Sequence, residues 1–391
     1  MEDADRKEHR TEAADALRGL LVRRIVAAGG LADPGWRTAF EQVPRHLFVP
    51  EYYSPRPGGY ERLSADDPDP KERARWLTGA YEDVPLVTHV QDGRLISSSS
   101  QPSLMASMAE ALEVREGRTV LEIGAGTGYN AALLAHRLGD DAVTTVDLDQ
   151  EITDAARAHL ATAGAAPAVV TGDGALGHPD RAPYDRIVAT CELPSVPVEW
   201  LRQCRPGGRI LAPFAGGLIR LTVTGPDRAE GRFLHTAAYF VPLRGTAAAH
   251  RQDPVPDGPH DGQHDGSPDA LPDDVPERVR WSGTPPRILE DDLFRFLLTL
   301  RTGALEVRWA SGYRGVAITA PDGSSARADR DGRVLLAGPR DLWAIAESAH
   351  ALWQRASRPA RDRYGLSVHG GRQWTWLDDP DGPHFWDVPA A

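Results

Sequence analysis

The sequence predicts an α/β fold: a mostly parallel sheet with helices on both faces, followed by a smaller α+β domain. Three observations support this prediction. Short apolar runs bounded by turn residues recur from residue 120 to about residue 225. Helical stretches at 129–138 and 150–163 separate the first runs, and such alternation is typical of a parallel sheet covered on both faces. An acidic, proline-rich segment then precedes a second set of strands and helices.

The segment before the predicted sheet is mainly helical. Residues 38–43 look like a short helix that ends before Pro44, and residues 54–69, rich in Pro, Gly and Asp, are expected to form a surface loop. A longer amphipathic helix comes first, because apolar residues recur at helical spacing at Leu17, Leu20, Leu21, Ile25 and Val26.

Composition excludes several classes of protein. A net charge of −12 argues against a general nucleic-acid-binding protein, which needs a basic surface. No apolar run reaches the roughly 18 residues that a membrane span requires. Residues 1–26 lack the apolar core of a signal peptide, and two cysteines, Cys191 and Cys204, imply no disulfide framework. We therefore expect a cytoplasmic protein.

The second half of the chain begins with an unusual segment. Residues 252–274 contain seven Asp, five Pro and three Gly, a composition that cannot bury a core and predicts a flexible acidic linker. We expect a first domain at 1–243, a linker at 244–286 and an α+β domain at 287–391. Gly and Pro around His260 and His264 disfavour a rigid pair of ligands, so we expect no metal site.

Tryptophan is concentrated in the predicted C-terminal domain. Seven of the ten tryptophans lie between Trp281 and Trp386. They could form the core of a small domain, or they could line an aromatic groove that recognises a peptide. The sequence leaves both interpretations open.

The strongest local signal is "VLEIGAGTGYNAALLA" at 120–135. A strand ends at Ile123, the glycines Gly124, Gly126 and Gly128 follow, and a helix begins. Glycines let the backbone turn tightly and approach a ligand, and the helix N-terminus presents free N–H groups to a carboxylate. The spacing differs from that of the dinucleotide-binding fingerprint, because Tyr129 follows the third glycine directly.

Two aspartates end the next two predicted strands. Asp147 closes "AVTTVDLD", where a carboxylate can accept hydrogen bonds from both hydroxyls of a ribose. Asp173, within "PAVVTGDG", follows the third predicted strand and is suited to accept a hydrogen bond from an adenine amino group, although it could also be an ordinary turn residue. Ligands of such sheets bind at the carboxyl ends of the strands, where these groups would meet.

This constellation resembles the class I S-adenosylmethionine-dependent methyltransferases, whose Rossmann-like sheet agrees with the predicted fold. The resemblance implies that S-adenosylmethionine is the cofactor. It places the methionine portion at the glycines, with Glu122 behind them, the ribose at Asp147 and the adenine at Asp173. The complete set of expected cofactor-binding residues is Ser97, Ser98, Glu122, Gly124, Ala125, Gly126, Thr127, Gly128, Asp147, Leu148, Asp173 and Gly174.

A narrower resemblance covers roughly residues 40–243. The segments "FEQVPRHLFVPE", "AYEDVPL", "ISSSSQPSLMASM", "VLEIGAGTGYNAALLA", "YDRIVATC", "RPGGRILAP" and "YFVPL" occur in the order seen in protein-L-isoaspartate O-methyltransferases. In that family the serine before the Gln-Pro or Ala-Pro lies at the active site, which implies a catalytic role for Ser100 and its neighbour Ser99. The chain departs from the family in a longer segment at 53–79, in Ser98-Ser99-Ser100 where Thr-Ile-Ser is usual, and in nearly 150 further residues.

The longer architecture and "RYGLSVHGGRQWTWLDDP" at 363–380 resemble methyltransferases of peptide-modification clusters that work beside ATP-grasp peptide cyclases, the graspetide systems. This resemblance implies methylation of an aspartate in a ribosomal peptide (a RiPP), closure to an aspartimide, opening to isoaspartate, and a co-encoded ATP-grasp partner. The alternatives are a general isoaspartyl repair enzyme, acting on unrelated proteins and peptides, and a non-catalytic module that delivers a peptide. No nucleic-acid or membrane partner is expected.

The chemistry of carboxyl methylation favours neutral hydroxyls near the acceptor. A carboxylate is ionised at neutral pH and needs no general base, so the enzyme has to align the oxygen, methyl carbon and sulfur and exclude water. Ser100 could orient the carboxylate by donating a hydrogen bond. Alternatively, Ser99 and Ser100 could only cap the helix predicted to begin at Pro102.

Overall fold

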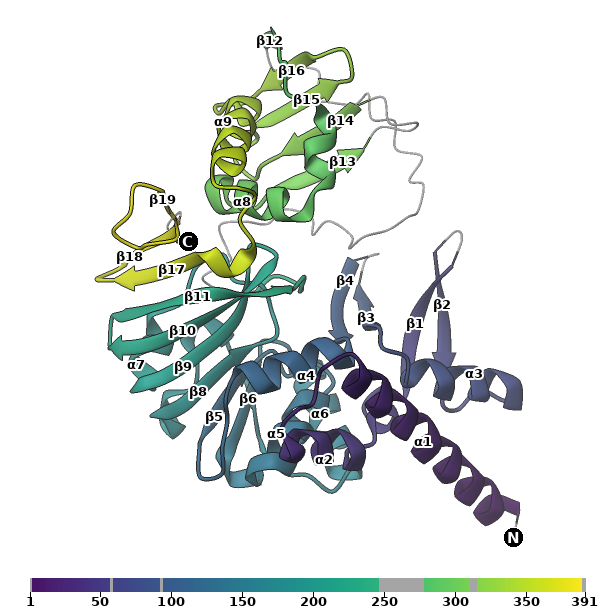
Figure 1. Cartoon of the computed structure of the whole chain (residues 1–391). Helices are drawn as coiled ribbons and strands as arrows, with labels where there is room; N and C mark the ends of the chain where they lie inside the picture. Colours follow the sequence, from purple (N-terminus) through teal and green to yellow (C-terminus); the bar gives the residue numbers. More distant parts are fainter. Residues whose placement is uncertain (1, 57–58, 92–93, 246–277, 310–314, 389–391) are drawn as a thin grey trace.

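The computed structural model describes residues 2–56, 59–91, 94–245, 278–309 and 315–388 (Figure 1). Within these residues the largest sheet has ten strands in the order β19-β18-β17-β11-β10-β9-β8-β5-β6-β7. Its parallel part contains β5 (Val120–Ile123), β6 (Val143–Asp147), β7 (Ala168–Thr171), β8 (Tyr184–Ala189) and the start of β9 (Cys204–Phe214). The predicted α/β class is therefore confirmed.

Helices cover both faces of this sheet. On one face, Val120, Val143 and Val188 pack in a core with the apolar sides of the N-terminal and central helices. Those helices are α1 (Glu2–Ala27), α2 (Pro34–Gln42), α4 (Pro102–Ala111), α5 (Tyr129–Leu138) and α6 (Gln150–Thr162). On the other face, Leu121 and Ile187 pack with Trp200 of α7 (Val198–Gln203). The helix predicted from Leu17 to Val26 is confirmed within α1, where Leu21, Val22 and Ile25 are buried.

The region before α4 forms a separate antiparallel sheet in the order β2-β1-β3-β4. Its strands are β1 (Glu51–Arg56), β2 (Gly59–Ser64), β3 (Leu86–Gln91) and β4 (Arg94–Ser99), with α3 (Pro70–Ala80) between β2 and β3. The prediction of a surface loop at 54–69 is thus wrong for most of its length. Buried Tyr52 and Leu63 anchor the hairpin, and the Tyr52 hydroxyl donates to the Trp76 carbonyl of α3 at 3.0 Å.

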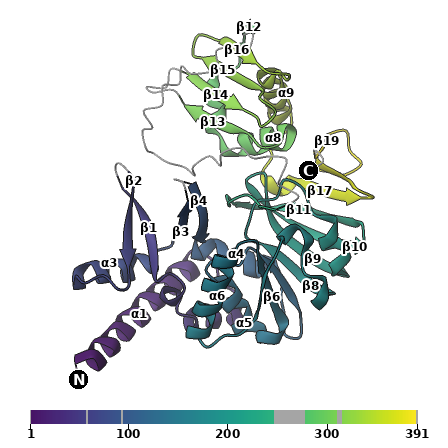
Figure 2. The same ribbon diagram turned by 180° about the vertical axis from the view of Figure 1, so that it is seen from behind.

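The C-terminal part contains a five-stranded antiparallel sheet in the order β12-β16-β15-β14-β13. The strands are β12 (Arg278–Trp281), β13 (Glu306–Trp309), β14 (Gly315–Thr319), β15 (Ser325–Asp329) and β16 (Arg333–Ala337), packed with α8 (Asp292–Thr302) and α9 (Leu342–Arg355). Both views place this unit near the β17–β11 end of the main sheet (Figures 1 and 2). Trp343 and Trp353 of α9 are buried, as the core interpretation predicts, whereas Trp281 is 71% exposed.

The sheets divide the chain differently from the predicted domains. β12 lies inside the predicted linker at 244–286, yet it pairs with β16 of the C-terminal sheet. β17 (Tyr364–His369), β18 (Arg372–Leu377) and β19 (Phe385–Asp387) lie inside the predicted domain at 287–391, yet they extend the main sheet from β11 (Arg228–Ala237), which follows β10 (Gly217–Gly225). The physical reason is that β11 would otherwise be an unpaired edge. The acidic segment with His260 and His264 lies outside the described residues.

Candidate active site

One pocket, about 860 Å³ with its open mouth included, lies at the carboxyl ends of β5 and β6. It brings together most of the residues predicted from sequence: Ser97, Ser98, Ser99, Ser100, Glu122, Gly124, Ala125, Gly126, Thr127, Asp147, Leu148 and Gly174. Gly128 and Asp173 do not line it. The segment 240–244 closes another side of the pocket and was not predicted to belong to the site.

The three glycines of the turn share a backbone conformation that favours glycine but differ in their surroundings. All have positive φ, at +96° for Gly124, +50° for Gly126 and +85° for Gly128, which side chains rarely tolerate. A Cβ at Gly124 would lie 2.5 Å from the Thr190 hydroxyl, and one at Gly128 would crowd α6. A Cβ at Gly126 would make only ordinary contacts, with the Ser98 carbonyl at 3.7 Å and the Ser97 hydroxyl at 3.8 Å, so its positive φ rather than crowding favours glycine there.

Asp147 lies at the strand end where the sequence predicts it. It ends β6, lines the pocket and accepts a hydrogen bond from the Gly126 N–H at 3.1 Å. Its other oxygen lies 4.0 Å from the guanidinium of Arg244, a partly exposed residue on the 240–244 segment. The carboxylate therefore remains accessible to a ligand hydroxyl from inside the pocket.

Glu122 is the most strongly perturbed acid of the pocket. It is fully buried, and Asn130 donates to its Oε1 at 2.6 Å, while Oε2 has no hydrogen-bond partner. Burial raises the pKa of Glu122 to about 7, and the interactions of its carboxyl group with the Thr145 hydroxyl and with Asn130 oppose that rise. An unpaired buried carboxylate oxygen is costly unless a donor satisfies it, so this position suits an ammonium group of a bound ligand.

Asp173 has a structural task in addition to any binding role. Its Oδ1 accepts from the Ala175 N–H at 2.9 Å and caps the short helix Gly174–Leu176. Its predicted contact with adenine stays a prediction.

The serine run forms a wall of the pocket next to the glycine turn. Ser97, Ser98 and Ser99 end β4, and the Ser97 hydroxyl and Ser98 carbonyl lie 3.8 and 3.7 Å from the position of a Cβ on Gly126. Ser99 is 3% exposed, and its hydroxyl has no hydrogen-bond partner. Ser100 follows as a half-buried residue of the pocket wall.

The alternative role of the serines as helix caps is wrong. Helix α4 begins at Pro102 with Gln101 as its N-cap, and the Gln101 side chain makes no capping hydrogen bond to a backbone N–H of the helix. Asp83, from the loop after α3, accepts the Ser103 N–H at 2.8 Å instead. The hydroxyls of Ser99 and Ser100 are therefore not used to start the helix.

Comparisons with known proteins agree with this geometry. The family model described as protein-L-isoaspartate(D-aspartate) O-methyltransferase matches residues 70–246. A protein-L-isoaspartate O-methyltransferase of Methanosarcina mazei is 36% identical over 221 residues, 55% of this chain and 79% of that protein. One from Archaeoglobus fulgidus is 34% identical and is covered over 94% of its length. The chain belongs to the protein-L-isoaspartate O-methyltransferase family.

It is an S-adenosylmethionine-dependent carboxyl O-methyltransferase. A solved structure named protein-L-isoaspartate O-methyltransferase aligns with a TM-score of 0.52 at 23% identity, over 90% of this chain and 96% of that one. This likeness shows the shared fold, which extends well beyond the part that the family model matches.

The pocket fits S-adenosylmethionine, the cofactor of this methyltransferase. The backbone at Gly126 lines the pocket, Asp147 is placed to accept hydrogen bonds from the ribose, and the unpaired oxygen of Glu122 is placed to accept a hydrogen bond from the ammonium group. The Ser97–Ser100 run would then face the methyl donor.

Sequence reasoning missed three residues that shape the site. Thr190 donates to the Gly124 carbonyl at 2.8 Å and supports the turn, and Arg244 approaches Asp147. Arg45 binds the carbonyls of Ser99 and Ser100 from behind the pocket wall. Arg45 and Thr190 lie in segments that resemble the family and Arg244 directly follows one, but spacing alone does not reveal the contacts that these residues make. Among the residues that the structure describes, no helix is both long and apolar enough to cross a membrane.

Proposed function

We propose that this methyltransferase esterifies the free carboxylate of L-isoaspartyl residues in proteins and peptides. The observation that carries the proposal is the serine run, in which Ser97 and Ser98 lie beside Gly126 and the buried Ser99 hydroxyl has no hydrogen-bond partner. Bound S-adenosylmethionine supplies an electrophilic methyl group on a sulfonium sulfur. The names of the curated relatives support the isoaspartyl substrate.

The polar groups suit a carboxylate acceptor. Within the described part of the pocket lining, the carboxyl groups are those of Glu122 and Asp147, both on the cofactor side. The wall opposite them carries hydroxyls, which donate hydrogen bonds to an anion without protonating it. An ionised carboxylate needs no general base, so Ser100 has to orient the attacking oxygen rather than activate it.

A narrower substrate, an aspartate in a ribosomal peptide modified together with an ATP-grasp enzyme, stays a prediction. The β1–β2 hairpin with α3 and the C-terminal unit are additional surfaces that could select such a peptide. The comparisons favour the general isoaspartyl substrate, because the relatives' names describe it and a solved structure of that name spans most of this chain. A non-catalytic delivery module does not fit an enzyme of this family.

The test uses the full-length protein, S-adenosylmethionine and two synthetic peptides that differ only in L-aspartate or L-isoaspartate at one position. Mass spectrometry should show one added methyl group on the isoaspartyl peptide and none on its partner, and an Asp147→Ala variant provides the control for cofactor dependence. Methylation only of aspartate in a ribosomal precursor peptide would support the narrower function instead. No methylation of any peptide by the folded, cofactor-bound wild type would overturn the proposal.

A further inference from the structure

We propose that Arg45 is a positioning residue for methyl transfer. Its guanidinium holds the end of the serine run by hydrogen bonds to the backbone carbonyls of that run. This inference rests on the proposed role of Ser99 and Ser100 at the acceptor carboxylate. Arg45 begins the short helix Arg45–Leu47, is 0% exposed and does not line the pocket. It lies behind the pocket wall and touches none of the atoms that would react.

The guanidinium of Arg45 joins two segments that are distant in sequence. Nη1 and Nη2 donate to five backbone carbonyls: Ala80 at 3.1 Å, Glu82 at 2.9 Å, Val84 at 3.1 Å, Ser99 at 3.4 Å and Ser100 at 3.2 Å. The first three lie at the end of α3 and in the loop between α3 and β3, and the last two end the serine run. A planar group with donors pointing in several directions can make this connection, whereas an apolar side chain cannot.

A second contact from the same loop fixes the other side of the serine run. Asp83 accepts the Ser103 N–H at 2.8 Å, and the Gln101 amide lies 3.4 Å from its second oxygen. The chain from Ser99 to Ser103 is therefore held at both ends by residues 80–84 and Arg45. This double attachment determines where the Ser99 and Ser100 hydroxyls lie relative to Gly126.

The environment of Arg45 is unusual for a purely structural residue. Its guanidinium is surrounded by carbonyl oxygens, and no ion pair of the described residues includes it, although Asp83 lies near enough to favour its charge. Burial lowers the pKa of Arg45 to about 10, so it still carries its charge at neutral pH. A buried cation without a paired carboxylate lowers the stability of the fold. A role in holding the serine segment explains why a cation is present at this position.

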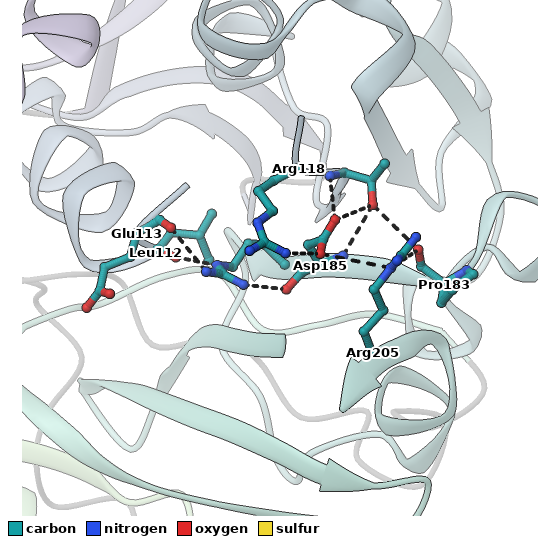
Figure 3. A network of polar contacts seen from close by, with 8 residues as sticks. Leu112, Glu113, Arg118, Pro183, Asp185 and Arg205 are labelled. Atoms are coloured by element: carbon teal, nitrogen blue, oxygen red, sulfur yellow. Dashed lines mark hydrogen bonds and ion pairs between the residues drawn. The ribbon is translucent and has the colours of Figure 1, made fainter. Parts of the chain in front are cut away.

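The decisive variant is Arg45→Lys, because lysine keeps the charge but has a single nitrogen that cannot span both sets of carbonyls. Its matched control is Arg186→Lys. Arg186 also donates to three backbone carbonyls, those of Leu112, Glu113 and Asp185 at 2.8, 3.1 and 2.8 Å. These contacts belong to a polar network at the opposite, amino-terminal ends of the strands (Figure 3). Loss of carbonyl contacts there should lower stability without moving the serines.

We expect Arg45→Lys to bind S-adenosylmethionine with the affinity of the wild type and to lose about a hundredfold in kcat on an isoaspartyl peptide, the effect of a small misalignment. Arg186→Lys should keep its kcat. Hydrogen–deuterium exchange should accelerate at residues 97–103 in Arg45→Lys alone. If Arg45→Lys does not fold, Arg45→Ala is assayed with added methylguanidinium, which should restore turnover.

The outcomes separate the two proposals. A wild type that transfers no methyl group to isoaspartyl peptides overturns the proposed function, while the exchange measurement still tests the contact made by Arg45. An active wild type together with a folded Arg45→Lys variant of unchanged kcat and unchanged exchange at 97–103 overturns the role of Arg45. The same holds if methylguanidinium fails to restore any turnover to a folded Arg45→Ala variant.

Discussion

Replacement of Ser100 by alanine should separate catalysis from stability. No side-chain hydrogen bond within the described residues uses the Ser100 hydroxyl, and Asp83 accepts the Ser103 N–H at the start of α4. Its removal should therefore change the free energy of unfolding by no more than about 0.5 kcal/mol. The lost hydrogen bond to an ionised carboxylate is worth roughly 1.5–3 kcal/mol, which corresponds to roughly a ten- to hundredfold loss in kcat/KM.

The assay measures formation of S-adenosylhomocysteine with an isoaspartyl peptide, together with the melting temperature of each variant. Ser103→Ala is the matched control, because it removes the same group three residues later, where the hydroxyl only accepts from the Gln101 amide at 3.0 Å. Ser100→Thr keeps the hydroxyl in a crowded wall and should be intermediate. The reasoning is refuted if Ser100→Ala turns over as the wild type does, or if both alanine variants lose activity alike.

Three further predictions follow from the structure. Asp147→Ala should weaken binding of S-adenosylmethionine by roughly 1.5–3 kcal/mol in calorimetric titration, and an unchanged Kd would contradict its ribose role. Burial raises the pKa of Glu122 from 4.5 to about 7. As the pH rises, the unfolded chain therefore loses this proton before the folded chain does. Above about pH 7 this difference lowers the free energy of unfolding by about 3 kcal/mol. Glu122→Gln should accordingly be more stable than the wild type at about pH 8 and equal to it near pH 4.5 in urea unfolding; a difference that is constant with pH would count against this account. Removal of residues 246–391 should expose the edge of β11 and the Phe233 ring, whose centroid lies 4.9 Å from that of Phe296. We therefore expect the fragment to aggregate in gel filtration and to lose cofactor binding in titration, and a soluble fragment that binds the cofactor would contradict this.

The candidate cofactor side of the pocket could be predicted from the sequence, because its features depend on residues that are close together in the chain. The conformations of Gly124, Gly126 and Gly128 depend on the absence of a side chain, and the alternation of apolar runs with helices implies a parallel sheet whose carboxyl ends meet. The position of Asp147 at the end of the second strand follows from the same periodicity. These features depend on neighbours in sequence, so a single chain suffices to predict them.

Tertiary contacts determined the features that do not depend on neighbours in the sequence. The return of β17 to β11 after more than a hundred residues has no sequence signal, because an unpaired strand edge accepts any suitable backbone. Pro and Gly at 54–69 suggested a loop, but burial of Tyr52 and Leu63 against α3 stabilises a hairpin there. The start of α4 likewise depends on Asp83, a residue of another segment, rather than on the adjacent serines. The sequence by itself predicted many of the residues that line the candidate cofactor pocket. Only the fold decided what holds the serines in place, because that support comes from long-range hydrogen bonds of Arg45 to backbone carbonyls, which every residue type carries.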